Sequence, residues 1–339
     1  MHPTTVHRLW FKGVVALLLL SVAVAGTVHT SPVGAAVSQP TGNIAFVWAN
    51  FAFNTEEIAI MQADGTNQMK LTNEEGFDVS PAWSPDGRRI AFTSSRSMPP
   101  GYQGEQRFYS ELYVMGADGS NVQRITFSEG MIDFQPAWSP DGRRIVVARG
   151  PGTSPPPDHL TAPTDLWIID LGTGREQQLT NSPGTWEWFA DWSPDGQRIA
   201  FEGDLAEPGN DDVYTIGVDG TGLQRLTSRP GFDGDAAYSP DGTSIAFDSD
   251  RTGNLDVFVM RTNGTNIRQL TNHPAGDAQP KYSPDGQFIA FFSERDGTQP
   301  PIVPFPTSDI FRMRADGTQQ TNLTKSPGVI EFDPHWQPA

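Results

Sequence analysis

The sequence predicts an all-β fold: a closed six-bladed β-propeller built from four-stranded antiparallel blades. One observation is a repeated block, PAWSPDGRRIAF at 81–92 and PAWSPDGRRIVV at 136–147, with shorter copies at 191–201, 238–247 and 282–291. A second is that every repeat contains four short segments rich in β-branched and aromatic residues, separated by turn residues. A third is that the two ends of the repeated region complement each other. Together they favour a ring of sheets over an open stack.

The period of the repeat is set by the aromatic residue before each Ser-Pro, or before the final Gln-Pro. These marker aromatics lie 44 to 55 residues apart: Trp83, Trp138, Trp192, Tyr238, Tyr282 and Trp336. Such a period suits one blade of four strands. No segment carries a convincing 3.6-residue apolar stripe, which argues against helices.

The second repeat illustrates the four expected strands: SPAWS, RIAFTS, ELYVMGA and NVQRIT. The turn between the first two is Ser-Pro-Asp-Gly, in which Pro presets φ and Gly accepts the exit conformation. The last two are joined by a tight Asp-Gly or Asn-Gly turn, the strongest short hairpin signal. The exception is Gly172-Thr173-Gly174.

The ends of the repeated region predict closure of the ring. GNIAFV, EEIAIMQ and NQMKLT resemble second, third and fourth strands with no first strand before them. EFDPHWQP resembles a first strand with no partner after it. We therefore expect the segment around Trp336 to pair with Ile44–Phe46, which would hide the edges that an open array exposes.

Three regions follow from composition. Residues 1–25 have the basic start, 13-residue apolar run and Ala-Val-Ala site of a cleaved signal peptide. The apolar run is shorter than the roughly 20 residues that a spanning helix needs. Residues 26–41 are expected to form a flexible leader, and 42–339 the propeller. We therefore expect a secreted or periplasmic monomer without stable membrane insertion.

Charge and cysteine content exclude several classes of function. The net charge of −17 argues against a nucleic-acid partner, while a cationic partner is compatible with it. The chain has no cysteine, so it has no disulfide, no thiolate nucleophile, no cysteine-based zinc site and no cysteine for lipid attachment. No G-x-S-x-G motif is present either.

The phrases DVSPAWSPDGRRIAF and DFQPAWSPDGRRIVV, with ELYVM and RIT after the first, resemble the PD40 repeat of TolB-type propellers, a WD40-like repeat. The resemblance covers nearly all of residues 42–337 and implies the propeller fold. One fold hosts many functions, so the resemblance does not by itself assign a function. That family carries an α/β domain ahead of the ring, and residues 1–41 are too few to form it. We expect the propeller without that domain.

The predicted site lies at the face that carries the second-to-third loops and the links between blades. These loops are long at 95–110, 150–164 and 293–307, and loops on a rigid scaffold commonly carry binding sites. Tolerated surface insertions are the alternative. An acid stands five residues before each marker aromatic: Asp78, Asp133, Glu187, Asp233, Asp277 and Glu331. At the start of the innermost strands, these carboxylates would surround one end of the channel.

Three interpretations of the carboxylates remain open. A hard cation such as Ca²⁺ would suit oxygen ligands, with Asp78, Asp133, Asp233 and Asp277 as candidates. A basic peptide or protein tail could enter the channel instead. The structural alternative is that each acid accepts hydrogen bonds inside its own link. Trp186 and Trp188 flank Glu187 and are either a ligand platform or packing between blades.

Two functions follow. The first is a non-enzymatic propeller that binds a protein or peptide partner through the long-loop face, with no catalytic residues and no cofactor unless Ca²⁺ binds. The alternative is an extracellular enzyme that acts on a carbohydrate or ester with channel acids and a divalent cation. For it, His159 and His273 are the conceivable contributors, although no histidine pair has metal-ligand spacing.

Overall fold

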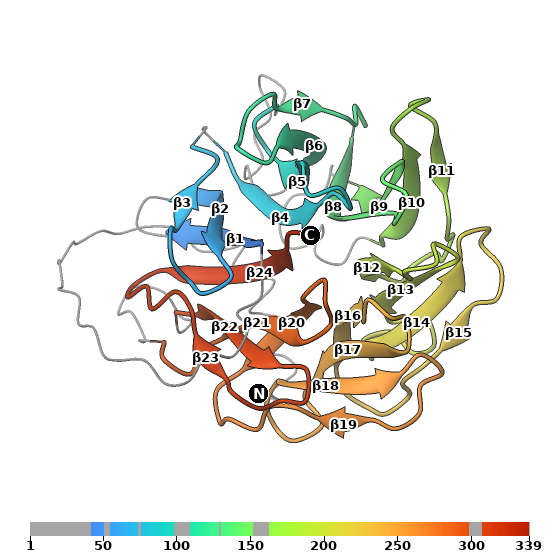
Figure 1. Cartoon of the computed structure of the whole chain (residues 1–339). Helices are drawn as coiled ribbons and strands as arrows, with labels where there is room; N and C mark the ends of the chain where they lie inside the picture. Colours follow the sequence, from blue (N-terminus) through green and yellow to red (C-terminus); the bar gives the residue numbers. More distant parts are fainter. Residues whose placement is uncertain are drawn as a thin grey trace.

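The computed structural model describes residues 42–50, 55–73, 76–97, 109–128, 130–151, 163–297 and 307–338. The predicted signal peptide and leader, His159 and most of the three long loops lie outside these residues. The described part contains only strands, turns and irregular segments, arranged as six four-stranded sheets around one axis (Figure 1). The predicted fold class is confirmed. No helix in these ranges has the length and apolar content needed to cross a bilayer.

The strands are numbered along the chain. Blade 1 contains β4 (Asp78–Trp83), β5 (Arg89–Ser94), β6 (Glu111–Gly116) and β7 (Gln123–Arg124). Blade 2 contains β8 (Met131–Trp138), β9 (Arg144–Pro151), β10 (Asp165–Asp170) and β11 (Glu176–Gln178). Blade 3 contains β12 (Glu187–Trp192), β13 (Arg198–Gly203), β14 (Asp212–Gly217) and β15 (Gln224–Arg225). Blade 4 contains β16 (Asp233–Tyr238), β17 (Ser244–Ser249), β18 (Asp256–Arg261) and β19 (Arg268–Gln269). Blade 5 contains β20 (Asp277–Tyr282), β21 (Phe288–Ser293), β22 (Asp309–Arg314) and β23 (Thr321–Asn322).

Blade 6 joins the two ends of the described chain. It consists of β24 (Ile330–Trp336), β1 (Asn43–Asn50), β2 (Thr55–Gln62) and β3 (Met69–Lys70), hydrogen-bonded in that order. Ile44 lies opposite Trp336 in the antiparallel register, as predicted. The amide of Asn43 also donates to the Gln337 side chain at 2.7 Å. The ring is therefore closed by strand pairing.

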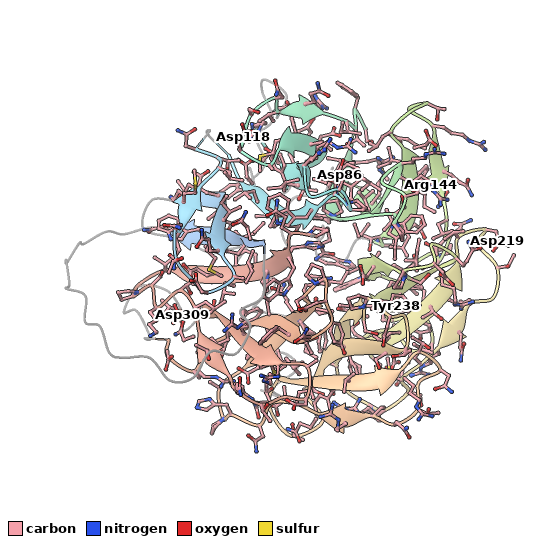
Figure 2. All side chains as sticks on the ribbon, viewed as in Figure 1. Asp86, Asp118, Arg144, Asp219, Tyr238 and Asp309 are labelled. Carbon is pink, nitrogen blue, oxygen red and sulfur yellow. The ribbon has the colours of Figure 1, made fainter. Side chains whose placement is uncertain are left out.

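The second strand of each blade forms the core. In β5, Ile90, Ala91 and Phe92 are fully buried, and the Ile-Ala-Phe residues of β1, β13, β17 and β21 are buried to the same degree. These strands are sandwiched between adjacent blades, which explains why their apolar residues are continuous and do not alternate with polar ones. Figure 2 shows the resulting radial arrangement: Asp219, in an outer turn, lies at the periphery, and Tyr238 lies closer to the axis.

The innermost strands share a bulge that the repeat does not reveal by itself. The residue two positions after each opening acid adopts a positive φ of 49° to 57°: Ser80, Gln135, Phe189, Asp235, Gln279 and Asp333. The register with the neighbouring strand shifts at the same place, as between Val79 and Ala82. A bulge of this kind bends the strand and increases its twist. It turns these side chains toward neighbouring innermost strands, where Gln135 accepts a hydrogen bond from the Phe189 N–H.

Candidate binding site at the long-loop end of the ring

The topology separates two faces of the ring. The tight-turn face carries the Ser-Pro-Asp-Gly turns and the Asp-Gly or Asn-Gly turns. In the first of these, Asp86 accepts hydrogen bonds from the Ser84 hydroxyl and the Arg88 N–H, and Gly87 has a φ of 65°. The opposite face, here called the long-loop face, carries the second-to-third loops and the links between blades. The predicted site residues all belong to the long-loop end of the innermost strands.

The six predicted carboxylates do stand at the starts of the innermost strands, but all are buried. None of them has more than 2% of its surface exposed: Asp78, Asp133, Glu187, Asp233, Asp277 and Glu331. A buried carboxylate is costly unless charged or hydrogen-bonding groups compensate it. The structure supplies compensating groups by two arrangements: from the same blade for the four aspartates, and from the preceding blade for the two glutamates.

Four of the aspartates are paired with arginines at the end of the second strand. The closest N–O distances are 2.7 Å for Asp78–Arg96, 2.5 Å for Asp133–Arg149, 2.9 Å for Asp233–Arg251 and 2.5 Å for Asp277–Arg295. In three blades the arginine follows a serine in a Ser-x-Arg sequence, and that serine accepts from the guanidinium Nε: Ser94, Ser249 and Ser293. Each pair thus joins the innermost and second strands of one blade, and we call these pairs clamps.

The arginines in these clamps also lie over aromatic rings. The Arg251 guanidinium is 4.7 Å from the Phe258 ring centre, and Arg295 is 4.8 Å from that of Phe311. The cation is therefore held by the carboxylate on one side and by ring faces on the other. Ser-x-Arg was the sequence signal that could have identified these partners.

Among the described residues, neither glutamate forms an ion pair with an arginine, and hydroxyl and amide groups lie beside each carboxyl group instead. Glu187 accepts from the Thr180 hydroxyl and from the Leu166 N–H. Burial raises the pKa of Glu187 to about 7 and that of Glu331 to about 8. The hydroxyls of Thr324 and Ser326 act in the opposite direction at Glu331. Both side chains consequently hold a proton more firmly than an ordinary glutamate.

A metal ion would have to compete with these internal partners. Within the described ranges, no three or more His, Cys, Asp or Glu side chains come together as a metal-binding group. Calcium takes six to eight oxygen ligands, whereas the carboxylates of Asp78, Asp133, Asp233 and Asp277 each face a guanidinium. Calcium binding at these four residues stays a hypothesis from the sequence, and the four guanidinium partners count against it.

The predicted tryptophans belong to an aromatic cluster at this end of the ring. Trp188 stacks on Phe134 of blade 2 with ring centres 5.3 Å apart, and its centre lies 6.3 Å from that of Trp186. Trp188 thus packs between two innermost strands. Phe134, Trp186 and Trp188 are only partly buried, so the cluster also presents apolar surface on the long-loop face. On the same face, the link of blade 1 exposes 69% of Phe127.

A second group of ionisable residues lies nearer the axis, and we call it the axial cluster. It consists of Asp191, Asp235, Asp248, Lys281, Asp333 and His335. Asp191 accepts from the Tyr238 N–H of the next blade at 2.8 Å. His335 does the same for the Trp83 N–H at 3.3 Å. These side chains connect innermost strands that belong to different blades.

Burial controls protonation in the axial cluster. The carboxyl groups of Asp235 and Asp248 face each other, and their burial and mutual repulsion raise the pKa of Asp235. Burial raises the pKa of Asp248 to about 8. Two adjacent buried carboxylates cannot both ionise cheaply, so this pair favours a protonated carboxyl group more than an exposed aspartate does. Burial and then Lys281 lower the pKa of His335 to about 3, so its imidazole is neutral.

Comparison with known proteins agrees with this architecture. The family model for the TolB beta propeller domain (PD40) matches residues 27–154 and 159–257, which together are more than half of the chain. The chain belongs to the TolB β-propeller family. A TolB homolog from Chlorobium luteolum is 30% identical over 175 residues, which are 49% of this chain and 33% of the relative.

Two further relatives support the family assignment and the fold. The Tol-Pal system protein TolB of Anaeromyxobacter dehalogenans is 32% identical over 123 residues, covering 36% of this chain and 25% of that protein. The crystal structure of TolB from Acinetobacter baumannii superposes with a TM-score of 0.70 at 23% identity, over 89% of this chain and 68% of that one. This TolB-family chain spans a third or less of the length of these two sequence relatives.

Sequence reasoning on this TolB-family propeller missed the axial cluster, although the aligned repeats contain a signal for it. The residue before the marker aromatic is Ala82, Ala137 or Ala237 in three blades. It is Asp191, Lys281 or His335 in the other three. Ionisable residues that replace alanine at one repeat position indicate a site that the repeat itself does not require. His273, in a blade-to-blade link, accepts from the Ala275 N–H and has no such signal.

Proposed function

We propose that this TolB-family propeller is a secreted or periplasmic protein that binds a protein or peptide partner through its long-loop face. The observation that carries the proposal is the partly exposed aromatic cluster of Phe134, Trp186 and Trp188, together with the exposed Phe127 on the same face. Exposed aromatic residues on a polar protein are enriched in binding surfaces, because each ring buries a large area at low entropic cost.

The repeat makes the exposure of Phe127 informative. The residue that follows the Leu-Thr or Ile-Thr ending is Asn73, Asn181, Ser228, Asn272 or Lys325 in the other blades. The fold therefore does not need an aromatic residue at this position. The Arg124 guanidinium lies 4.6 Å from the centre of the Phe127 ring and holds it on the surface. Phe127 is held in an exposed position where the other five repeats have polar residues. Contact with a partner best explains this arrangement.

Charge supports a partner with basic character. The chain has a net charge of −17, and an excess of negative charge favours the approach of cationic groups. A partner segment with lysine or arginine next to apolar residues would match both features of this face. The predicted signal peptide and the named Tol-Pal relatives support an envelope location.

The test is affinity capture from the envelope fraction of the producing cell, with purified propeller as bait. Phe127→Ala and Trp188→Ala are the test variants, and Leu223→Ala on the tight-turn face is the control, since Leu223 is also an exposed apolar residue (53%). We expect one protein to be retained by the wild type and by Leu223→Ala, and to be lost or strongly reduced with Phe127→Ala. Equal capture by all variants, or no saturable capture by the wild type, would overturn the proposal.

Thermal melting of each variant separates binding from folding. Phe127 is mostly exposed, so its replacement should leave the melting temperature close to that of the wild type. Trp188 packs on Phe134, and its replacement should cost about 1–3 kcal/mol, less than a fully buried tryptophan. A Phe127→Ala protein that melts normally and no longer captures the partner is the decisive result.

A further inference from the structure

The tight-turn face contains a repeated contact between neighbouring blades. The first residue of the second strand reaches the marker aromatic of the following blade. The Arg89 guanidinium is 4.6 Å from the centre of the Trp138 ring, and Arg144 is 4.8 Å from that of Trp192. Arg198 is placed in the same way and lies beside Tyr238, whose pKa it acts to lower. An arginine thus lies over the aromatic ring in two successive gaps and beside the tyrosine hydroxyl in a third.

The gap between blades 4 and 5 lacks this arginine. Ser244 occupies the position of Arg89, Arg144 and Arg198, while the aromatic Tyr282 is retained in the following blade. A hollow of about 590 Å³ is present there, lined among others by Ser244, Tyr282, Asp241, Asp285, Arg261 and Arg268. In the next gap the position is taken by Phe288, a buried ring. The hollow therefore coincides with a repeat in which serine takes the place of arginine, whereas in blade 6 the position is Asn43, whose side chain is bonded to Gln337.

The carboxylate in the adjoining turn supports the same interpretation. Asp86, Asp141 and Asp195 each feel the positive charge of the arginine three residues later. Asp241 is the equivalent residue in blade 4, and the residue three positions later is Ser244. Asp241 still accepts hydrogen bonds from the Ser239 hydroxyl and the Thr243 N–H, so its orientation is preserved. The turn thus keeps a carboxylate without the arginine that follows it in three other blades.

We propose that this hollow binds an arginine side chain of a peptide or protein partner, with the guanidinium over Tyr282 and beside Asp241 and Asp285. The partner would supply in trans the group that Arg89, Arg144 and Arg198 supply within the chain. A guanidinium fits better than an ammonium, because it is planar, stacks on ring faces and forms bidentate hydrogen bonds with carboxylates. The site lies on the face opposite the proposed aromatic surface, so neither proposal depends on the other.

The two arginines that line the hollow define the main competing ligand class. Arg268 is engaged by the next blade, where its Nη1 donates to the Asp316 carbonyl at 3.0 Å. Arg261 is exposed at the rim. If these cations dominated, the hollow would select a carboxylate or another anion in place of a guanidinium. The experiment below distinguishes binding of a guanidinium from binding of a carboxylate.

The experiment measures binding of three small probes by ligand-observed NMR titration. N-acetyl-arginine amide, N-acetyl-lysine amide and N-acetyl-glutamate amide present only the side chain, without terminal charges. We expect weak binding of the arginine probe, at least threefold tighter than the lysine probe, and no saturable binding of the glutamate probe. Preference for the glutamate probe, or no arginine binding at tens of millimolar, would overturn the proposal.

Two variants localise the binding. Ser244→Arg restores the residue present in three other blades and should fill the hollow, so binding of the arginine probe should be lost while the protein stays folded. Gln197→Arg is the matched control, because it adds the same charge on the same face, beside a gap that Arg198 already fills. It should leave the affinity unchanged. Retained binding by Ser244→Arg would overturn the assignment.

A third variant keeps the test valid if Ser244→Arg folds poorly. Asp241→Asn preserves the side-chain oxygen that caps the turn and removes its charge. We expect this variant to bind the arginine probe at least threefold more weakly, with a melting temperature within a few degrees of the wild type. An unchanged affinity with Asp241→Asn would contradict a guanidinium site at this turn.

Discussion

Asp133 and Arg149 form a two-point ion pair inside blade 2, with Arg149 Nε 2.5 Å from Oδ1 and Nη2 3.1 Å from Oδ2 of Asp133. The Asp133 side chain is fully buried and that of Arg149 is 4% exposed. Burial acts to raise the pKa of Asp133, and the guanidinium acts to lower it. The guanidinium of Arg149 therefore offsets the cost of burying the charge of Asp133.

Asp133→Asn should destabilise the propeller by about 3–5 kcal/mol, because it removes the buried counter-charge of Arg149 and leaves only the partly exposed Glu176 beside it. Urea unfolding at pH 7 measures the effect. Glu176→Gln is the control: Glu176 contacts the same guanidinium but is partly exposed, and its loss should cost about 1 kcal/mol or less. Similar losses in the two variants would show that the buried pair does not depend on mutual compensation.

Calcium should not bind measurably to the carboxylates that open the innermost strands. A cation at Asp78, Asp133, Asp233 or Asp277 would have to displace an arginine at a distance of 2.9 Å or less. Titration calorimetry with millimolar Ca²⁺ should therefore give no saturable heat, and a chelator should leave the melting temperature unchanged. Saturable heat that disappears in Asp133→Asn would instead establish a calcium site.

Glu331 should make the propeller less stable as the pH rises through the neutral range. Its pKa is raised from 4.5 to about 8 by burial, so the folded state holds the proton more tightly than the unfolded chain. The stabilisation from this proton is complete below about pH 4.5 and is lost as the pH rises toward and through 8. Glu331→Gln stays neutral and should lose less stability between pH 5 and pH 8.5.

Urea unfolding at several pH values tests this difference. Glu207→Gln is the control, because Glu207 is exposed in a loop and its replacement should shift stability equally at every pH. The pKa of Glu187 is also raised, to about 7, so the free energy of unfolding of the Glu331→Gln protein should still decrease somewhat with pH. Parallel curves for the wild type and Glu331→Gln would contradict the expected role of this proton.

Trp336→Ala should be as costly as the same change within the continuous chain. Trp336 is buried, and its indole N–H donates to the Lys281 carbonyl at 3.0 Å. Trp192 makes the equivalent bond to Ala137 at 3.1 Å. Both substitutions should cost about 3–5 kcal/mol in urea unfolding. A much smaller loss for Trp336→Ala would mean that blade 6 is loosely closed.

The repeat made the fold predictable because each blade depends on local rules that the sequence states directly. Ser84, Pro85, Asp86 and Gly87 specify one turn, and the apolar residues after them specify a buried strand. The closing strand was predictable because the segment around Trp336 is a first strand without followers. Three strands at one end of the repeated region and one at the other make one blade, so this count alone predicted that the two ends pair.

The chemistry of the site was less predictable, because it depends on which residues meet across blades. The acids at the strand starts were located correctly, but a repeated carboxylate does not say whether it faces water or a guanidinium. Arg96 lies 18 positions after Asp78, and only the strand register brings the two together. The repeat likewise does not predict that Asp235 meets Asp248, or that a hollow lies where Ser244 replaces arginine, because both positions differ from the repeat.

Blade closure also constrains the order in which the molecule can be completed. Synthesis begins at the N-terminus, so β1, β2 and β3 are made long before β24, and the hydrogen-bonded residues Asn43 and Gln337 are 294 positions apart. Until β24 arrives, the inner edge of β1 has no partner from its own chain and can pair with the last strand of another molecule. Crowded or interrupted folding should therefore produce exchanged dimers in which each ring is completed by its neighbour's final strand.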